Sequence, residues 1–299
     1  MFSFLAKVAW AGSSIDGPHG GLRNVSGKDE QFLVFNVFNA AALRDNIRES
    51  AAELALFADV VAPFHFDAAD CPGPGGGGPG PGEVRFDAAH LALMGHSMGA
   101  TISLLTAGVR TDLVNGLALL EPVVLPAAGY AVAQLPLGPQ LQRIAMPLAV
   151  GAAKRRNEFA SREEAVAAFT GRGIFKAFPP EVIADYVGDG LIEDGKGGFK
   201  LACAPAFEAA TYTAQRHDPW GAMRKVTDPM VMLRASHGST ISEASMHRMA
   251  AIKADARVGT VEGASHMLPM ERPDRARAAI ETAALLARAG RKYHDALVQ

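Results

Sequence analysis

The chain has 299 residues, of which 49% are hydrophobic and 20% charged, and its formal net charge is -2 at pH 7. This composition is typical of a globular protein with enough apolar material for a core. The nearly neutral charge argues against a nucleic acid or a membrane as partner, because either normally requires a basic protein surface.

The first part of the chain predicts a strand, a helix and a loop. Residues 31–38 are mostly apolar and aromatic and predict a strand. From Asn39 to about Val61, apolar residues recur at steps of three and four, which predicts an amphipathic helix. Residues 72–82 are all Pro or Gly and predict a surface loop. That loop lacks the Gly-Lys-Ser/Thr ending of a phosphate-binding loop, so we reject that function for it.

Strands and helices alternate in the chain after residue 90. Such alternation indicates a parallel sheet with helices on both faces. The predicted strands are 91–94, 116–120, 229–233 and 257–261, and the predicted helices are 100–109, 245–254 and 274–299.

The alternation is interrupted between residues 123 and 226, where the sequence predicts helices. Ser161-Arg-Glu-Glu164 has the pattern of a capping box, and Pro180 precedes another helical run. We interpret 123–226 as a helical cap or lid, and 1–122 together with 227–299 as the core. Most aromatic residues of the cap are expected to form its own core, and a few to line a pocket.

The segment Gly95-His96-Ser97-Met98-Gly99 lies between a predicted strand and a predicted helix. A tight strand-to-helix turn forces its central residue into a strained conformation, and flanking glycines are expected to relieve the steric conflict. Such a turn exposes the Ser97 hydroxyl as a nucleophile. It also places the Met98 amide at a helix N-terminus, where it can donate to an oxyanion.

This elbow, and Gly263-Ala-Ser-His-Met-Leu-Pro-Met-Glu-Arg-Pro273, resemble the α/β-hydrolase superfamily, in which the second segment carries the catalytic histidine. The resemblance runs from about Asp16 to the C-terminus. It implies an α/β-hydrolase fold, hydrolysis through an acyl-enzyme, no cofactor, and the chain order serine, acid, histidine. A serine at the elbow disfavours haloalkane dehalogenase and epoxide hydrolase chemistry, which uses Asp there.

His266 is the predicted general base. It lies five residues after the strand that ends at Val261, and a base must reach the serine from such a loop. His237 is the main competitor, because it follows the strand that ends near Leu233. His96 lies within the elbow and is expected to point away from the path of the nucleophile.

Glu121 is the predicted acid, although the usual position for it is the loop at 234–242. That loop contains no carboxylate before Glu243. Glu121 directly follows the strand 116–120, and some α/β-hydrolases carry their acid at that strand end. The alternatives are a structural carboxylate at the start of the cap and a catalytic Glu243.

The segment Ser14–Gly21 leaves two interpretations open. It resembles the part of the family that follows the fourth strand, so the first strands and the oxyanion loop would be missing from this chain. Alternatively, His19-Gly20-Gly21 is itself the oxyanion motif, 78 residues before Ser97. We favour the first interpretation, and the second oxyanion donor stays open.

Two cysteines, Cys71 and Cys203, form neither a disulfide framework nor a metal-binding pattern. We therefore expect free thiols in a reducing compartment and no metal. The apolar start of the chain is interrupted by Lys7 and is interpreted as a buried element rather than a signal peptide, and no apolar run would span a bilayer. A cytoplasmic protein is expected, and a homodimer is left open.

These observations lead to three hypotheses about function. The first is hydrolysis of a small or medium apolar carboxylic ester. The second is hydrolysis of an activated carbon–carbon bond by the same three residues. The third is a truncated, non-catalytic binding protein that retains the pocket under the cap.

Overall fold

The computed structural model describes residues 51–52, 54–57, 59–60, 63–67, 83–85, 91–135, 137, 146–213 and 217–298. The predictions made for the strand 31–38, for the loop 72–82, for the segment at 14–21 and for Cys71 lie outside these residues. The predicted helix from Asn39 is described only in part, and the described residues 51–52, 54–57 and 59–60 are helical.

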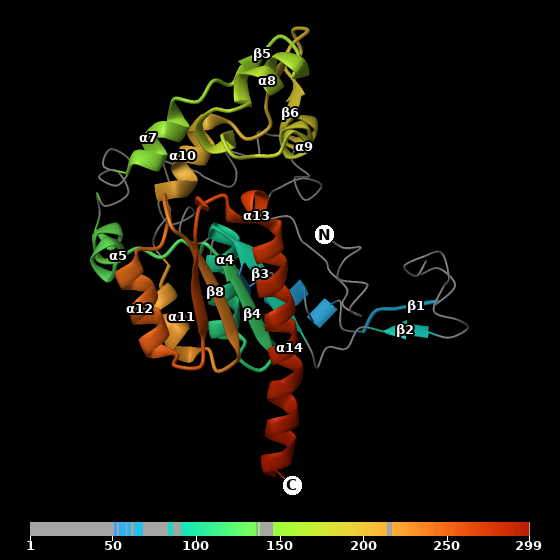
Figure 1. Ribbon diagram of the computed structural model, residues 1–299, viewed down its shortest axis with the longest axis vertical. Helices are drawn as coiled ribbons and strands as arrows, with labels where there is room; N and C mark the ends of the chain where they lie inside the picture. The colour runs from blue at the N-terminus through green and yellow to red at the C-terminus, as the bar shows by residue number, and fades with distance from the viewer. Residues whose placement is uncertain are drawn as a thin grey trace.

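A four-stranded parallel sheet lies at the centre of the described chain (Figure 1). Every residue of β4 is buried, as expected for a strand covered on both faces of a parallel sheet. The predicted mostly parallel sheet flanked by helices is thereby confirmed, with strand ends displaced by one or two residues. The order is β3 (Ala92–His96), β4 (Gly116–Leu120), β8 (Met230–Ala235) and β9 (Arg257–Val261).

Alternate residues of the strands contribute to two separate hydrophobic clusters, one on each face of the sheet. Leu117 and Leu119 of β4 belong to a cluster that includes side chains of α4 (Met98–Val109), α11 (Pro219–Lys225) and α12 (Glu243–Ile252). Ala118 and Leu120 belong to the cluster formed with α13 (Leu268–Glu271) and α14 (Pro273–Val298). This division follows from the two-residue period of a strand, whose successive side chains point to opposite faces.

An insertion between β4 and β8 lies beyond the sheet edge at which α13 is found (Figure 1). Ser161 begins one of its helices as predicted, since its Oγ accepts a hydrogen bond from Glu164 N at 3.2 Å. Glu164 Oε2 in turn accepts a bond from Ala160 N at 2.6 Å, which completes a variant of the capping box. Besides α11, the helices of the insertion in the described residues are α5 (Ala127–Gln134), α7 (Pro147–Ala153), α8 (Arg162–Phe169), the 3-10 helix η4 (Gly173–Phe175), α9 (Pro180–Gly190) and α10 (Pro205–Thr213).

The prediction of a wholly helical insertion is wrong in one respect. A three-stranded antiparallel sheet, in the order β5 (Glu158–Phe159), β7 (Phe199–Leu201) and β6 (Leu191–Glu193), lies among its helices. Strands of two or three residues are too short to show a two-residue hydrophobic period, so the sequence gives little sign of them. The boundaries of a separate cap at 123 and 226 stay a prediction.

Aromatic residues form much of the interior of the insertion, as expected. The ring of Phe169 stacks on Phe175 at a centroid distance of 4.7 Å, and Phe159 and Tyr186 contact Phe169 edge-on. At the base of the insertion, Trp220 Nε1 donates to Leu125 O at 3.1 Å. That bond joins the segment that leaves β4 to the helix that precedes β8.

Two further strands, β1 (His65–Asp67) and β2 (Glu83–Arg85), form a separate antiparallel pair. Within the described residues, no helix combines the length and the apolar character that crossing a membrane requires.

Candidate active site

Ser97 occupies the sharp turn between β3 and α4. Its φ of 56° and ψ of -125° lie in a region that residues with a Cβ atom rarely adopt. Its amide donates to Leu120 O of the neighbouring strand at 3.0 Å, which holds the turn against the end of β4. The sequence prediction of a strained strand-to-helix elbow therefore agrees with the geometry at this residue.

The two elbow glycines have different roles. A Cβ atom on Gly95 would overlap the backbone of Gly99, so only glycine fits there. A Cβ atom on Gly99 would have no atom within 4 Å. The expectation that both glycines relieve a steric conflict is thus corrected: the fold requires the missing side chain only at Gly95.

His266 lies on the loop between β9 and α13 and reaches Ser97 from there. Its Nε2 atom is 2.9 Å from Ser97 Oγ. The loop is held by Glu271, whose two carboxylate oxygens accept bonds from Ser265 N at 2.7 Å and Ser265 Oγ at 2.6 Å. By contrast, His237 is exposed, and its ring contacts Ser236 Oγ at 3.4 Å.

Glu121 follows β4 and is fully buried, with a relative exposure of 0%. Its Oε2 atom is 3.0 Å from His266 Nδ1, the ring nitrogen that faces away from Ser97. A carboxylate only accepts hydrogen bonds, so Nδ1 carries the proton and Nε2 is left to accept one from Ser97 Oγ. The structure therefore brings Ser97, His266 and Glu121 into one hydrogen-bonded chain.

Burial alone would raise the pKa of Glu121, because it disfavours the charged form. Hydrogen bonds from His266, Ala235 N, Ser239 Oγ and Thr240 N stabilise the carboxylate and hold its pKa below the ordinary value. The Ser239 and Thr240 bonds measure 2.8 and 3.1 Å. Glu121 is therefore a negative charge directly behind the histidine at neutral pH.

Ser239 and Thr240 are site residues that sequence reasoning missed. The sequence alone assigns no role to the hydroxyl and amide groups of the loop at 234–242, yet these groups bind the carboxylate of Glu121, which follows β4. Thr240 Oγ1 also lies 3.3 Å from His266 Nδ1 and donates to the main-chain oxygens of Glu121 and Pro122 at 3.2 and 3.3 Å. No local pattern in the sequence signals this role, because Glu121 lies 118 and 119 positions before the two residues.

The predicted oxyanion donor Met98 is the first residue of α4. The first N–H groups of a helix have no partner within the helix and carry its positive dipole end, so this amide suits a developing negative charge. The alternative donor segment, His19-Gly20-Gly21, lies outside the described residues.

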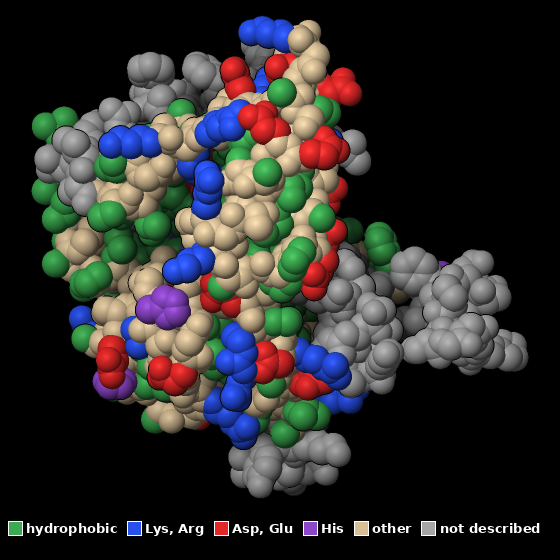
Figure 2. Space-filling view, turned by 45° about the horizontal axis from the view of Figure 1, so that its top comes forward, with side chains coloured by type: hydrophobic (Ala, Val, Ile, Leu, Met, Phe, Trp, Pro, Cys, Tyr) green, Lys and Arg blue, Asp and Glu red, His purple; other side chains and the backbone are tan. Residues whose placement is uncertain are grey.

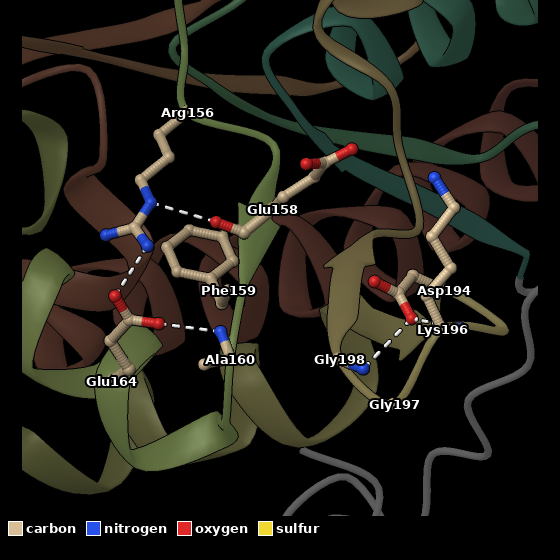
Figure 3. Close-up of a pocket in the computed structure, with 9 residues that line it drawn as sticks. All are labelled: Arg156, Glu158, Phe159, Ala160, Glu164, Asp194, Lys196, Gly197 and Gly198. Atoms are coloured by element: carbon tan, nitrogen blue, oxygen red, sulfur yellow. Dashed lines mark hydrogen bonds and ion pairs between the residues drawn. The ribbon is translucent and has the colours of Figure 1, made fainter.

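Two of the hollows on the described surface differ in character. The first, of about 540 Å³, lies within the insertion, and five of its nine lining residues are charged (Figure 3). Arg156, for example, bonds to Glu164 Oε1 and to Glu158 O there. Ser97, His266 and Glu121 do not line it, and neither does any residue of the segments next to them, so we do not connect it with Ser97.

The second hollow, of about 490 Å³, lies between α9 and α13. Phe178, Val182 and Tyr186 line it from the insertion, and Met270 lines it from α13, the helix that follows His266. Asp185, Asp189 and Gly190 complete the lining. This hollow places apolar surface of the insertion close to the loop that carries the histidine.

The surface of the molecule carries charges of both signs. On the face shown in Figure 2, Lys and Arg side chains are interspersed with Asp and Glu. In the part of the chain that the structure describes, no three His, Cys, Asp or Glu side chains are grouped so that they could hold a metal ion.

A sequence profile of the alpha/beta hydrolase family matches residues 37–279 of the chain. A comparison with curated proteins gives no match. Among solved structures, E-2-(acetamidomethylene)succinate hydrolase is 21% identical with a TM-score of 0.56, covering 79% of this chain and 73% of its own. A peroxisomal alpha-beta-hydrolase from Saccharomyces cerevisiae is 14% identical with a TM-score of 0.58, covering 91% and 66%. At these identities the two structures show a shared fold.

Proposed function

The chain belongs to the α/β-hydrolase family, and from this premise we propose that it is a serine hydrolase that cleaves a small or medium apolar carboxylic ester through an acyl-enzyme. The observation that carries the proposal is the chain of hydrogen bonds from Ser97 Oγ to His266 Nε2 and from His266 Nδ1 to Glu121 Oε2, at 2.9 and 3.0 Å. Nucleophile, base and orienting carboxylate need these contacts.

In the first half of the reaction, Ser97 Oγ attacks the ester carbonyl carbon while its proton passes to His266 Nε2. The resulting tetrahedral oxyanion accepts a hydrogen bond from the Met98 amide. As the carbon–oxygen bond to the alcohol breaks, His266 returns the proton to the departing oxygen. The products of this half are a free alcohol and an acyl group on Ser97.

In the second half, water attacks the acyl carbon and gives a proton to His266, and Ser97 leaves with that proton to release the acid. Glu121 keeps its negative charge throughout. It holds the histidine tautomer that accepts the serine proton and stabilises the imidazolium that forms twice in each cycle.

The preference for an apolar substrate is supported by the hollow between α9 and α13. Its walls include Phe178, Val182, Tyr186 and Met270 but none of the three catalytic residues, and Met270 lies four residues after His266 in the sequence. A pocket lined mainly by apolar side chains binds an apolar acyl or alkyl group by removing its surface from water.

The same experiments also test two other hypotheses about function. Hydrolysis of an activated carbon–carbon bond would use the same three residues on a different substrate. A non-catalytic binding protein would not need Ser97 and His266 within hydrogen-bond distance, so the observed contact favours an enzyme.

Labelling with a fluorophosphonate probe, together with hydrolysis of p-nitrophenyl acetate, butyrate and octanoate, tests the proposal. We expect the wild-type protein to be labelled at Ser97 and to hydrolyse at least one ester. Ser97→Ala should lose both properties and keep its circular dichroism spectrum, because the removed hydroxyl contributes little packing. A wild-type protein that is not labelled would support the binding hypothesis, and one that is labelled but inactive on esters would favour another substrate class.

A further inference from the structure

His96 makes a contact that the catalytic scheme above does not use. The sequence predicts that its side chain points away from the path of the nucleophile, and the structure places the ring against His266, with centroids 4.9 Å apart. His96 Nε2 lies 2.7 Å from the main-chain oxygen of His266. A carbonyl oxygen only accepts, so His96 Nε2 carries a proton and donates it to this bond.

The hydrogen bond between His96 and the His266 carbonyl connects the segment of the nucleophile, Ser97, directly to the main chain of the base, His266. His96 is the last residue of β3 and is paired in register with Leu120 of β4, so its backbone is fixed by the sheet. It is also the residue directly before Ser97. The strand end that presents the nucleophile therefore also holds the main chain of the residue that must accept its proton.

On the other side of the loop, Ser265 is held by Glu271. The His266 main chain is thus fastened at its amino side by a carboxylate and at its carbonyl by His96. Proton transfer requires Nε2 and the serine oxygen within a narrow range, and a displacement of about 1 Å can cost roughly 10²-fold in rate.

From these contacts we propose that His96 is a positioning residue, which fixes the main chain of His266 so that its Nε2 stays within reach of Ser97. This inference rests on the proposed function. The side chain does not touch the reacting atoms and acts only through the loop of the base.

The charge state of His96 suits this role. Burial has the largest effect and lowers the pKa of His96, and the neighbouring His266 ring lowers it further. The bond to the His266 carbonyl and the charge of Glu121 raise the pKa, but its net shift is downward. His96 is consequently neutral at neutral pH. A neutral donor adds no positive charge beside the imidazolium that His266 forms during the reaction.

Two substitutions that introduce the same amide group on side chains of different length, His96→Gln and His96→Asn, test the proposal. The side-chain amide of His96→Gln extends about as far as Nε2 of histidine and can donate to the carbonyl. In His96→Asn the amide is one methylene shorter and falls short of it. We expect His96→Asn to lower kcat for the preferred ester roughly 10- to 100-fold with KM nearly unchanged, and His96→Gln to keep most of the wild-type kcat. His96→Phe, which keeps a ring but has no hydrogen-bond donor, should lower kcat about as much as His96→Asn.

A second measurement does not depend on activity. The His266 Nδ1 proton bonded to Glu121 should give a downfield proton NMR signal, which we expect to persist in His96→Gln and to shift or broaden in His96→Asn and His96→Phe. If His96 had only a structural role, the substitutions would lower the melting temperature, and His96→Gln and His96→Asn would not differ in kcat or in this NMR signal.

The outcomes distinguish this inference from the proposed function. If the wild-type protein is active and the Asn and Phe variants keep kcat and the NMR signal, the positioning role is wrong while the proposed function stands. If the wild-type protein hydrolyses no ester and is not labelled, the proposed function fails, and the NMR comparison still decides the role of His96.

Discussion

The side chain of Glu121 shows why a buried charge needs several partners. An ionised carboxylate without them would shift its pKa and become neutral. Here a ring nitrogen, two main-chain amides and a hydroxyl bind its two oxygens. The residue is therefore both a structural anchor between β4 and β8 and the orienting group for His266.

Glu121→Gln should lower kcat by roughly 10²- to 10⁴-fold, because a neutral amide neither stabilises the imidazolium nor fixes the histidine tautomer. The variant should also lose about 1–3 kcal/mol of unfolding free energy, since one oxygen replaces two as acceptors for buried donors. Steady-state kinetics and urea unfolding measure the two effects. Glu243→Gln is the control, and an inactive Glu243 variant beside an active Glu121 variant would reverse the assignment.

The stability contributed by Glu121 should depend on pH in a definite direction. Its folded-state pKa lies below the ordinary value of 4.5, so folding favours the charged form. That contribution is fully present above 4.5 and is lost as the pH falls through the folded-state pKa. The difference in unfolding free energy between wild type and Glu121→Gln should therefore be constant near neutral pH and shrink in acid. A difference that grew in acid would contradict the lowered pKa.

Replacement of His266 should affect kcat far more than replacement of His237. His266→Ala removes the group that lies 2.9 Å from Ser97 Oγ and should lower kcat by several orders of magnitude. His237 is exposed and should be replaceable by Ala with little change. Kinetics of the two purified variants on the same ester compare them, and the opposite ranking would move the base to the other loop.

Residues with a local signature could be assigned from the sequence, and residues that act through long-range contacts could not. Ser97 and His266 stand in short segments with a clear position relative to strands. Ser239 and Thr240 act only because the fold brings them to Glu121, more than a hundred positions away. No local pattern marks a hydroxyl as the partner of such a distant carboxylate.

The strands β3, β4 and β8 were predictable because each contains a short apolar run, whereas β9, with the mixed sequence Arg257-Val-Gly-Thr-Val261, followed from the alternation of strands and helices. The short strands β5, β6 and β7 were not, since their pairing depends on contacts between segments rather than on composition. The elbow illustrates both cases. Its position follows from the strand and helix that flank it, whereas the unequal roles of Gly95 and Gly99 depend on which side of the turn faces the helix backbone.

Alanine at the two elbow glycines should have unequal effects. Gly95→Ala would force β3 away from the start of α4 and should reduce both the amount of folded protein and activity strongly. Gly99→Ala has open space for its methyl group and should fold like the wild type. Thermal unfolding and fluorophosphonate labelling of both variants provide the comparison. Equal destabilisation would show that Gly95 is not in close contact with the backbone of Gly99.

At the scale of the whole molecule, the insertion joins the sheet through two neighbouring segments. Trp220 Nε1 bonds to Leu125 O, and Val124 forms a bridge with Ile241. The guanidinium of Arg248 also lies 4.8 Å from the centroid of the Trp220 ring. The start and end of the insertion are therefore fastened to each other at its base.

Trp220→Phe would remove the indole donor and keep most of the ring. We expect a loss of about 0.5–1.5 kcal/mol in unfolding free energy and faster amide hydrogen exchange around residues 124–126. Arg248→Gln is the control, because it removes the cation over the ring and leaves the indole bond intact. If amide exchange around residues 124–126 were unchanged in Trp220→Phe, the bond from Trp220 to Leu125 would not stabilise the base of the insertion.

The positive φ of Ser97 implies that the protein is less stable than its fold allows. A residue with a Cβ atom in such a conformation costs about 1–3 kcal/mol, which glycine avoids, although glycine loses roughly 0.5–1 kcal/mol through the greater freedom of its unfolded chain. Ser97→Gly should accordingly melt at a higher temperature than Ser97→Ala, and both should be inactive; equal melting temperatures would show that the turn is relaxed. Selection for thermal resistance alone would then replace this serine, so its presence in the sequence is itself a trace of selection for reactivity.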